Sequence, residues 1–190
     1  RDCLLSRGLG DVYKRQGFRL DVADELPDEF IEKVRAAVKR VSPEKFLLGE
    51  VWEDATTKFG FNKRRTYLLG KGLDSVMNYP FKNAVLDFVK GKPAEQAMGE
   101  ILSICEHYPA PAMDTALNFL STHDTERALT VIADEPANGR GREWQSGRCV
   151  TGEAYEEGML RLRMAYAIIY TLPGVPCLYY GDCLLYTSPS

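Results

Sequence analysis

The chain has 190 residues, of which 45% are hydrophobic and 27% are charged, as in ordinary folded proteins and unlike disordered or fibrous chains. Its net charge of -3 is spread along the chain, which excludes the basic stripe typical of nucleic-acid or anionic-membrane binding and favours a neutral partner. The five cysteines form no CxxC pair and the two histidines lie far apart, so neither a zinc site nor a disulfide framework is predicted.

The two ends of the chain differ from the rest. The tetrapeptide DCLL at 2–5 recurs at 182–185, and neither copy lies in a periodic segment. Segments 1–16 and 183–190 resemble translated sequencing-adapter DNA, so we interpret them as non-native tails. The alternative is that they are native ends that have frayed. Residues 17–182 are expected to carry the fold.

From residue 17 onward, short apolar runs alternate with longer segments of helical period, which is typical of βα units around a parallel sheet. Strands are predicted at 18–22, 45–51, 73–79, 116–122 and 174–180. Helices are predicted at about 30–41, 83–90, 94–107 and 153–171. The polar, glycine-rich segment 134–148 is predicted to be a long surface loop, in which Trp144 either pins the loop or touches a substrate.

The apolar residues of two predicted helices recur at helical spacing and indicate which face packs. The face of the first helix is predicted to hold Phe30, Val34, Ala37, Val38 and Val41. The face of the third is predicted to hold Ala97, Ile101, Leu102 and Cys105. The longest apolar stretch, 164–180, has prolines and a glycine at 173–176, so we interpret it as a helix followed by a strand and not as a membrane span.

Asp21 lies inside a predicted strand, where aspartate is unfavourable, and therefore needs an explanation. Alternation places Arg19 and Asp21 on one face of that strand and the apolar Phe18, Leu20 and Val22 on the face that would meet the helices. Arg19 and Asp21 could form a buried ion pair without chemistry. The other interpretation is a reactive site at the end of the sheet, because another acid, Glu50, ends the next strand.

Neighbouring parallel strands lie about 4.8 Å apart, so Asp21 and Glu50 are predicted to approach to about 5 Å, the separation of the two carboxylates in a retaining glycosidase. Arg19 beside Asp21 favours its ionised form, while the anionic Asp21 and a water-poor pocket keep Glu50 protonated. This predicts Asp21 as nucleophile and Glu50 as acid. Asp124, arriving from the fourth predicted strand, could stabilise positive charge on the sugar ring.

Four segments in order, GFRLDVADE, LLGEVWE, FLSTHDTER and LPGVPCLYYGD, are similar to signature segments of the α-amylase family of glycoside hydrolases. The resemblance covers 17–182 and implies an α/β fold, the second half of a (β/α)8 TIM barrel with about five βα units. The site residues that it implies are the nucleophile Asp21, the acid/base Glu50, the transition-state stabiliser Asp124 and the sugar-site residues Arg19 and His123.

The segments VADE, GEVWED and LDSVMNYPF most resemble those of the neopullulanase, cyclomaltodextrinase and maltogenic amylase branch. Asp24 and Glu25 stand where typical α-amylases have a Lys-His pair, which implies that Glu25 lines the site that receives the leaving sugar. Trp52, placed by alternation on the same strand face as Glu50, either stacks on a sugar or packs the rim.

This sequence departs from the family pattern because the first signature segment and three barrel strands are absent. A complete barrel needs roughly 250 residues, so we expect 17–182 to be the C-terminal part of the catalytic barrel. Missing strands would leave two open sheet edges and an uncovered apolar interior. The chain by itself is therefore predicted to be poorly stable, aggregation-prone and inactive.

For the intact parent, the resemblance implies cleavage of α-1,4-glucosidic bonds in starch-type glucans, maltooligosaccharides or cyclodextrins. A glucanotransferase or an α-glucosidase is an alternative, as is a non-catalytic barrel partner subunit, although such subunits typically lose carboxylates that are present here. No cofactor is required for this chemistry, while calcium could bind the intact parent. We expect no nucleic-acid or membrane partner, leave a homodimeric parent open, and favour a cytoplasmic location because the cysteines are unpaired.

Overall fold

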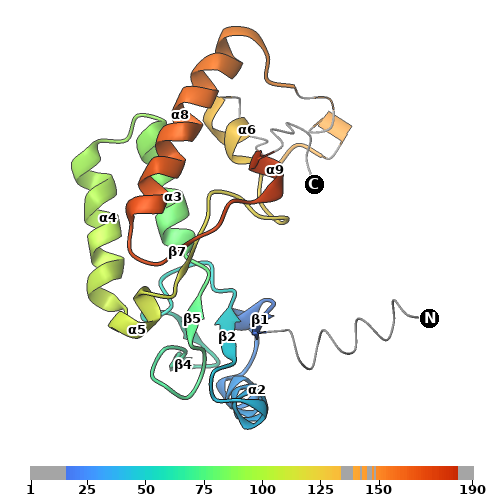
Figure 1. The fold of residues 1–190 in the computed structure, drawn as a ribbon, viewed down its shortest axis with the longest axis vertical. Helices are drawn as coiled ribbons and strands as arrows, with labels where there is room; N and C mark the ends of the chain where they lie inside the picture. The colour runs from blue at the N-terminus through green and yellow to red at the C-terminus, as the bar shows by residue number, and fades with distance from the viewer. Residues whose placement is uncertain (1–15, 134–138, 142, 145–146, 148, 184–190) are drawn as a thin grey trace. The chain divides into compact units, whose positions relative to one another are not determined.

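The structure, a computed structural model, describes residues 16–133, 139–141, 143–144, 147 and 149–183, with no side-chain description for Cys183. The predicted tails, apart from Gln16 and Cys183, and much of the predicted loop 134–148 lie outside these residues. The described chain forms two compact units, which we call the first unit (16–77 and 108–115) and the second unit (78–107 and 116–183). Strands and helices alternate along it, so the α/β class is confirmed (Figure 1).

A three-stranded sheet forms the centre of the first unit, in the order β1-β2-β5. Its strands are β1 (Gly17–Leu20), β2 (Phe46–Gly49) and β5 (Ser75–Val76). Neighbouring strands are parallel, with Gly17 opposite Phe46 and Leu20 opposite Gly49. The predicted strands at 18–22, 45–51 and 73–79 are therefore present but shorter than expected.

The predicted apolar face of the first strand is not buried. Phe18 and Val22 are each 43% exposed. Val22 has φ 45 and ψ 48, in the left-handed region, so the strand and its alternation of faces end at Leu20. A short 3-10 helix, η2 (Ala23–Glu25), follows.

Helix α2 (Asp28–Val41) connects β1 to β2 but buries a different face from the one predicted. Ile31 and Val38 are buried, whereas Phe30 is 49% and Val41 68% exposed, and Ala37 is exposed as well. The spacing of the apolar residues is compatible with burial of either face, the one with Phe30 and Val41 or the one with Ile31 and Val38. The predicted face is therefore wrong at Phe30, Ala37 and Val41.

Two cations on the buried side of α2 explain its rotation, because both bind Asp74 just before β5. Arg35 Nη1 lies 2.6 Å from Asp74 Oδ1 and Lys39 Nζ lies 2.8 Å from Oδ2. The backbone N–H of Leu47 also donates to this carboxylate, at 2.8 Å. Burial raises the pKa of Asp74, but the hydrogen bonds from Lys39, Arg35 and Leu47 outweigh it, so the net pKa lies below its ordinary value.

A β-hairpin that the sequence did not predict lies between β2 and β5. Its strands, β3 (Phe59–Gly60) and β4 (Lys63–Arg64), are antiparallel and joined by a two-residue turn. Phe61 and Asn62 at the turn have φ 53 and 61. Positive φ at both central residues is the mark of a type I′ hairpin turn. The strands are too short and polar to give a period.

The second unit is mainly helical, with α3 packed against both α4 and α8, and α6 packed against α8 (Figure 1). Its strands β6 and β7 pair in parallel. The bounds of its elements are α3 (Tyr79–Val89), α4 (Ala94–His107), β6 (Leu117–Asn118), α6 (Ala128–Ala133), α8 (Gly152–Thr171), β7 (Val175–Pro176) and α9 (Tyr180–Cys183). The helices predicted at 94–107 and 153–171 are confirmed, while the strands predicted at 116–122 and 174–180 are shorter. The first unit also holds a short helix, α5 (Ala110–Met113).

Helix α3 begins four residues before the predicted start, so the end of the predicted strand 73–79 is wrong. The Asn78 side chain caps the helix by accepting a hydrogen bond from the Phe81 N–H at 3.3 Å. Pro80 in the first turn is compatible with a helix start because it lacks an N–H to satisfy. These local signals override the apolar run that suggested a continuing strand.

Helix α4 buries Ala97, Ile101 and Ile104, whereas Leu102 is 51% exposed and Cys105 is half-buried. The predicted face is therefore correct at its first two positions and shifted at the end. The reason is helical geometry. Residues three or four positions apart, such as Ala97, Ile101 and Ile104, share the face that packs on α3, whereas Leu102 lies on a neighbouring face.

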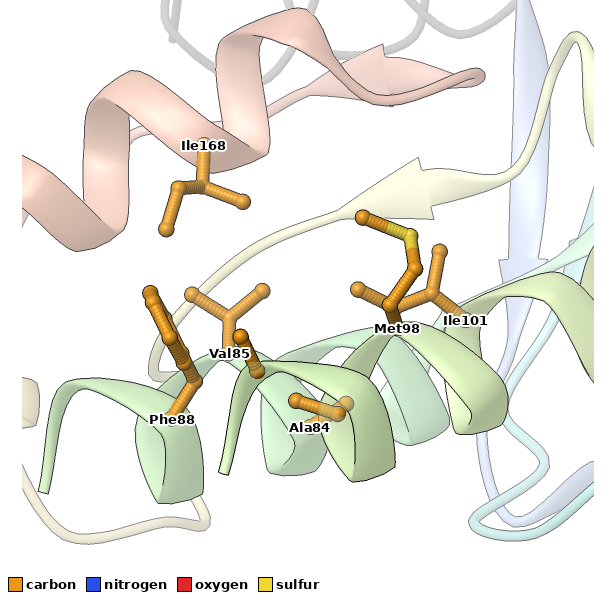
Figure 2. A pocket seen from close by; sticks show the side chains of 8 residues that line it. Ala84, Val85, Phe88, Met98, Ile101 and Ile168 are labelled. Atoms are coloured by element: carbon orange, nitrogen blue, oxygen red, sulfur yellow. The ribbon is translucent and has the colours of Figure 1, made fainter. Parts of the chain in front are cut away.

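Side chains of α3, α4 and α8 converge on a pocket of about 210 Å³ (Figure 2). All of its lining residues are apolar: Ala84, Val85, Phe88, Ala94, Ala97, Met98, Ile101 and Ile168. A sugar needs hydrogen-bonding partners, which this lining does not offer. The pocket is thus a gap in helix packing and not the site sought below.

The apolar stretch 164–180 is divided as predicted. Helix α8 ends at Thr171, Gly174 follows with φ 111, and β7 begins at Val175. Within the part of the chain that the structure describes, no helix is long and apolar enough to cross a membrane.

Candidate active site

Asp21 and Glu50 lie opposite each other at the carboxyl ends of β1 and β2. The parallel pairing continues beyond the strands, because the Glu50 N–H donates to the Leu20 carbonyl at 3.0 Å and the Ala23 N–H donates to the Glu50 carbonyl at 3.0 Å. This ladder fixes the height of both residues at one edge of the sheet. The structure therefore places the two acids at neighbouring strand ends, as the βα alternation predicted.

Arg19 binds both carboxylates with one guanidinium. Its Nη1 pairs with Asp21 Oδ1, and its Nη2 lies 2.9 Å from Glu50 Oε2. Its Nε lies 3.4 Å from the sulfur of Met77, which follows β5. Arg19 was predicted to pair with Asp21 alone, whereas in the structure it binds both Asp21 and Glu50.

The two acids differ sharply in exposure. The Asp21 side chain is 71% exposed, while that of Glu50 is 3% exposed. The Arg19–Asp21 ion pair is therefore not buried, so the alternative of a buried ion pair with no catalytic role is wrong. Asp21 is accessible to a ligand, and Glu50 lies beneath it.

The backbone of Val22 contributes to the site. Its N–H donates to Glu50 Oε2 at 2.8 Å, and its backbone is in the left-handed region, with φ 45 and ψ 48. A β-branched residue at positive φ is strained, at a cost of about 1–3 kcal/mol. Such strain, next to two paired acids, is typical of a functional site.

Glu25 and Trp52 lie on the rim of the first unit. Glu25 ends the short helix η2 and is exposed, and no side chain in the described part of the chain binds its carboxylate. Trp52 is 41% exposed and lies in a bend after β2. Because β2 ends at Gly49, the strand-face argument that placed Trp52 beside Glu50 does not apply. Its exposure nevertheless leaves the ring accessible.

His123 and Asp124 lie in the second unit, at the end of a buried run. Phe119 and Leu120, which follow β6, are fully buried, whereas the side chains of His123 and Asp124 are 59% and 46% exposed. His123 Nε2 lies 2.8 Å from Asp124 Oδ2. The predicted site residues thus form two sets, with five in the first unit and these two in the second.

Two buried polar residues that were not predicted from the sequence support the turn at 123–124. Asp182 is 3% exposed, and its carboxylate accepts from the Ser121 hydroxyl at 2.7 Å, the Tyr166 hydroxyl at 2.6 Å and the Ala128 N–H at 3.3 Å. Ser121 precedes the turn and Ala128 follows it. Burial, together with the hydrogen bond to Asp182, raises the pKa of Tyr166. The signal in the sequence was an acid directly after the apolar run that ends LYYG.

The second missed residue is Arg127, which is 6% exposed. Its Nη1 donates to the Thr122 carbonyl at 3.3 Å, and its guanidinium lies 4.8 Å from the centre of the Tyr179 ring and 5.7 Å from that of Tyr180. A Cβ on Gly181 would lie 2.5 Å from Arg127 Nε, so a larger residue there would require the Arg127 side chain to move. Arg127 thereby ties the turn to the segment after β7.

Two further predictions concern the loop and metals. Trp144 is half-buried, and the Arg140 guanidinium lies 4.4 Å from its ring centre, which supports a role in pinning the loop. Among the described residues, no group of three or more His, Cys, Asp or Glu could hold a metal ion.

The family model for the alpha-amylase catalytic domain matches residues 13–189 of this chain. The chain therefore belongs to the alpha-amylase family, whose catalytic domain is a (β/α)8 barrel, and the predicted incomplete barrel is confirmed.

The relatives belong to the branch that the sequence segments indicated. The amylopullulanase of Thermoanaerobacter thermohydrosulfuricus is 35% identical over 182 residues, and a cyclomaltodextrinase of a Bacillus species is 34% identical over 171 residues. Each match covers 87% of this chain but 11% and 24%, respectively, of those proteins. The solved type III pullulan hydrolase from Thermococcus kodakarensis is 29% identical with a TM-score of 0.69, covering 88% of this chain and 26% of that one. The chain thus spans about a quarter of its relatives' length, or less.

Proposed function

We propose that this segment supplies the catalytic carboxylates of a retaining glycoside hydrolase that cleaves α-1,4-glucosidic bonds in starch-type glucans, maltooligosaccharides or cyclodextrins. The observation that carries the proposal is the single Arg19 guanidinium bound by both Asp21 and Glu50 at neighbouring strand ends. One guanidinium reaches both carboxylates, so they lie close together, and this supports double displacement, for which a separation of about 5 Å is expected. Inverting enzymes need about 6.5–9.5 Å to admit a water molecule.

In the proposed reaction, an oxygen of Asp21 attacks the anomeric carbon while the bond from that carbon to the glycosidic oxygen breaks. Glu50 gives its proton to the leaving oxygen. A water molecule then attacks the anomeric carbon of the glycosyl ester, Glu50 takes the proton from this water, and the bond to Asp21 breaks. Two inversions retain the α configuration. The exposure of Asp21 supports its role as the attacking group.

The other site residues have supporting roles in this proposal. Arg19 orients both acids by pairing with each of them. Asp124 stabilises positive charge on the sugar ring, His123 binds the sugar, Glu25 lines the leaving-sugar site, and Trp52 stacks on a sugar. The short contact between His123 and Asp124 and the exposure of all four side chains support these assignments.

A glucanotransferase or an α-glucosidase would use the same covalent intermediate, so these remain candidate activities of the same site. The names of the relatives, cyclomaltodextrinase and amylopullulanase, support hydrolysis of cyclodextrins, starch-type glucans and pullulan first. The non-catalytic alternative is disfavoured because Asp21, Glu50 and Asp124 are all present.

We also propose that no cofactor takes part in the reaction, that calcium binding and dimer formation are properties to be sought in the longer protein, and that this protein is cytoplasmic. The thiols of Cys105 and Cys177, which form no disulfide within the described residues, support a reducing compartment.

The activity test requires the complete enzyme, by which we mean the gene product that contains residues 17–182 within a whole barrel. Asp21→Asn is expected to lower turnover of β-cyclodextrin on the order of a thousandfold or more. The matched control is Asp114→Asn, an exposed acid of the first unit, and should be silent. Unchanged turnover in Asp21→Asn removes Asp21 from the role, and a β-configured first product, detected by NMR, contradicts double displacement.

Glu50→Gln separates the acid from the nucleophile. It should abolish cyclodextrin hydrolysis but spare formation of the glycosyl ester from 4-nitrophenyl α-maltoside, because nitrophenolate leaves without a proton. The expected result is a burst of nitrophenolate followed by slow turnover. Equal loss on both substrates in the burst phase would contradict an acid role.

The 190-residue chain alone is expected to be inactive and prone to aggregation, and the exposure of Phe18 on the edge strand β1 and of Val22 just after that strand supports this. A cooperative thermal melt together with amylolytic activity of the purified chain would contradict the expectation.

A further inference from the structure

Arg65 is a buried arginine of the first unit that the proposed chemistry does not use. It follows β4, and its side chain is fully buried. Its guanidinium binds three acceptors in turn along the loop between β1 and α2. Nη1 donates to the Asp24 carbonyl at 2.9 Å, Nη2 donates to the Leu26 carbonyl, and Nε donates to Asp28 Oδ1 at 2.7 Å.

Two of these acceptors lie on either side of Glu25 along the chain. The carbonyls of residues 24 and 26 belong to the two peptide neighbours of Glu25, so holding both fixes the direction in which its side chain leaves the backbone. Asp28 begins α2 and is itself buried, which anchors the far end of the loop. A planar guanidinium offers several donors in one rigid fork, and a lysine could not bind all three acceptors in this way.

The β3–β4 hairpin holds Arg65 in place. The guanidinium lies 4.4 Å from the centre of the Tyr67 ring and 5.2 Å from that of Phe61. Phe61 occupies the hairpin turn at positive φ, an unfavourable conformation for a bulky residue, and this turn brings its ring toward Arg65. A Cβ on Gly60 would lie 3.2 Å from Arg65 Nη1, so the strand also packs closely on the side chain.

A second cation from the same segment binds the loop. Lys58 Nζ lies 3.4 Å from Asp24 Oδ2, and the Asp24 side chain is 11% exposed. Asp24 is therefore turned toward the hairpin segment, whereas the neighbouring Glu25 is exposed. The two acids that follow the strand are thus separated into one that fastens the loop and one that faces solvent.

We propose that Arg65 is a positioning residue that sets specificity for the sugar on the leaving-group side, by holding Glu25 where it meets a glucosyl leaving group or acceptor. This inference rests on the proposed function, since it assigns Glu25 to that same site. The hairpin between β2 and β5 then acts as a brace for acceptor recognition and not for the carboxylate chemistry. Preorganised groups bind without first losing conformational freedom, which is the gain expected here.

The test uses the complete enzyme and two kinds of substrate. 4-Nitrophenyl α-maltoside has an aryl leaving group, whereas β-cyclodextrin and maltotriose place a glucosyl unit against Glu25. Arg65→Gln and Arg65→Lys are expected to lower kcat/KM about tenfold on the glucosyl substrates, the loss of about one well-placed hydrogen bond, and to change the aryl substrate less than twofold. In the same two variants, transfer of maltosyl groups to added glucose should also decrease. This is measured as the ratio of transfer product to hydrolysis product.

Removing a buried arginine can reduce folding, so two further variants accompany the first pair. Lys58→Met frees the Asp24 side chain from a half-buried partner and should shift the substrate ratio in the same direction, by a few fold. Arg64→Gln is the matched control. Arg64 is an exposed neighbour on β4 whose Nε donates to the Thr56 carbonyl, and the ratio should not change.

A double-mutant cycle assigns the effect to Glu25. If Arg65 acts through Glu25, the Arg65→Gln and Glu25→Gln double variant should be no worse than the poorer single variant on cyclodextrin. Additive losses, or equal losses on the aryl and glucosyl substrates, would overturn the inference while leaving the carboxylate chemistry intact. Absence of aryl-maltoside turnover in the unmodified enzyme would instead refute the proposed function.

Discussion

Replacing Asp182 by asparagine should loosen the turn that carries His123 and Asp124. Asp182 is nearly inaccessible and binds donors on both sides of that turn, namely Ser121 before it and Ala128 after it. Asparagine has the same shape, so the substitution removes charge and one acceptor without leaving a hole. Its effect therefore measures the hydrogen bonds and not the packing.

The magnitude follows from the three donors. A hydrogen bond to a charged acceptor contributes about 1.5–3 kcal/mol, and a neutral bond about 0.5–1.5 kcal/mol, so each donor loses about 1 kcal/mol. The Ala128 N–H needs an oxygen, so the new amide nitrogen must face the hydroxyls of Ser121 and Tyr166, which can reorient to accept. A neutral amide is cheaper to bury than a carboxylate, which offsets part of the loss. We expect a decrease of about 2 kcal/mol in the free energy of unfolding.

Urea unfolding of the complete enzyme at pH 7, with the slope unchanged, gives this free energy directly. Ser121→Ala serves as the comparison, because it removes one of the three donors and should cost about 1 kcal/mol. Turnover by Asp182→Asn should fall about tenfold, since Asp124 is no longer held in one position. A loss below about 0.5 kcal/mol, or an equal loss in Ser121→Ala, would refute the reasoning.

Three further predictions concern the first unit of the complete enzyme. Hydrogen bonds lower the pKa of Asp74 in the folded protein. Its ionised carboxylate therefore stabilises the fold above its ordinary pKa of 3.8, and this stabilisation is lost as the pH falls through the lowered pKa. Asp74→Asn should make the urea midpoint depend less on pH when it is measured from pH 7 to pH 2. Gly17→Ala should cost about 3 kcal/mol, because its Cβ would lie 2.1 Å from the Phe46 carbonyl oxygen; a melting temperature equal to wild type would contradict this. Val22→Asn should stabilise by about 1 kcal/mol in urea titrations, because asparagine tolerates positive φ better than valine, and a lower midpoint would show that Val22 is not strained.

Several features could be predicted from the sequence because they depend on local patterns. Apolar runs and helical periods gave the order of strands and helices, with residues 94–107 correct at both ends. The placing of Asp21 and Glu50 at neighbouring strand ends needed only the βα alternation, since successive parallel strands end at the same edge of a sheet. The four signature segments indicated the family that the comparison confirmed.

Other features were missed because no local pattern carries them. The apolar residues of α2 fit two stripes, and the choice between them depended on Asp74, which lies far along the chain from Arg35 and Lys39. The bounds of α3 depended on the cap at Asn78, which a run of apolar residues concealed. Periodicity thus predicts that a helix forms but not which neighbour it packs against.

The sequence by itself determined the family, the α/β order and the placement of Asp21 and Glu50 at neighbouring strand ends, because these features depend on neighbouring residues and short motifs. Only the tertiary structure decided that Arg19 bridges both acids, that Arg65 holds the loop of Glu25 from 41 positions away, and that Asp182 supports the Ser121 turn from 61 positions away. The physical reason is that a buried charge must find its partners wherever the fold places them, and the separation along the chain has no part in that choice.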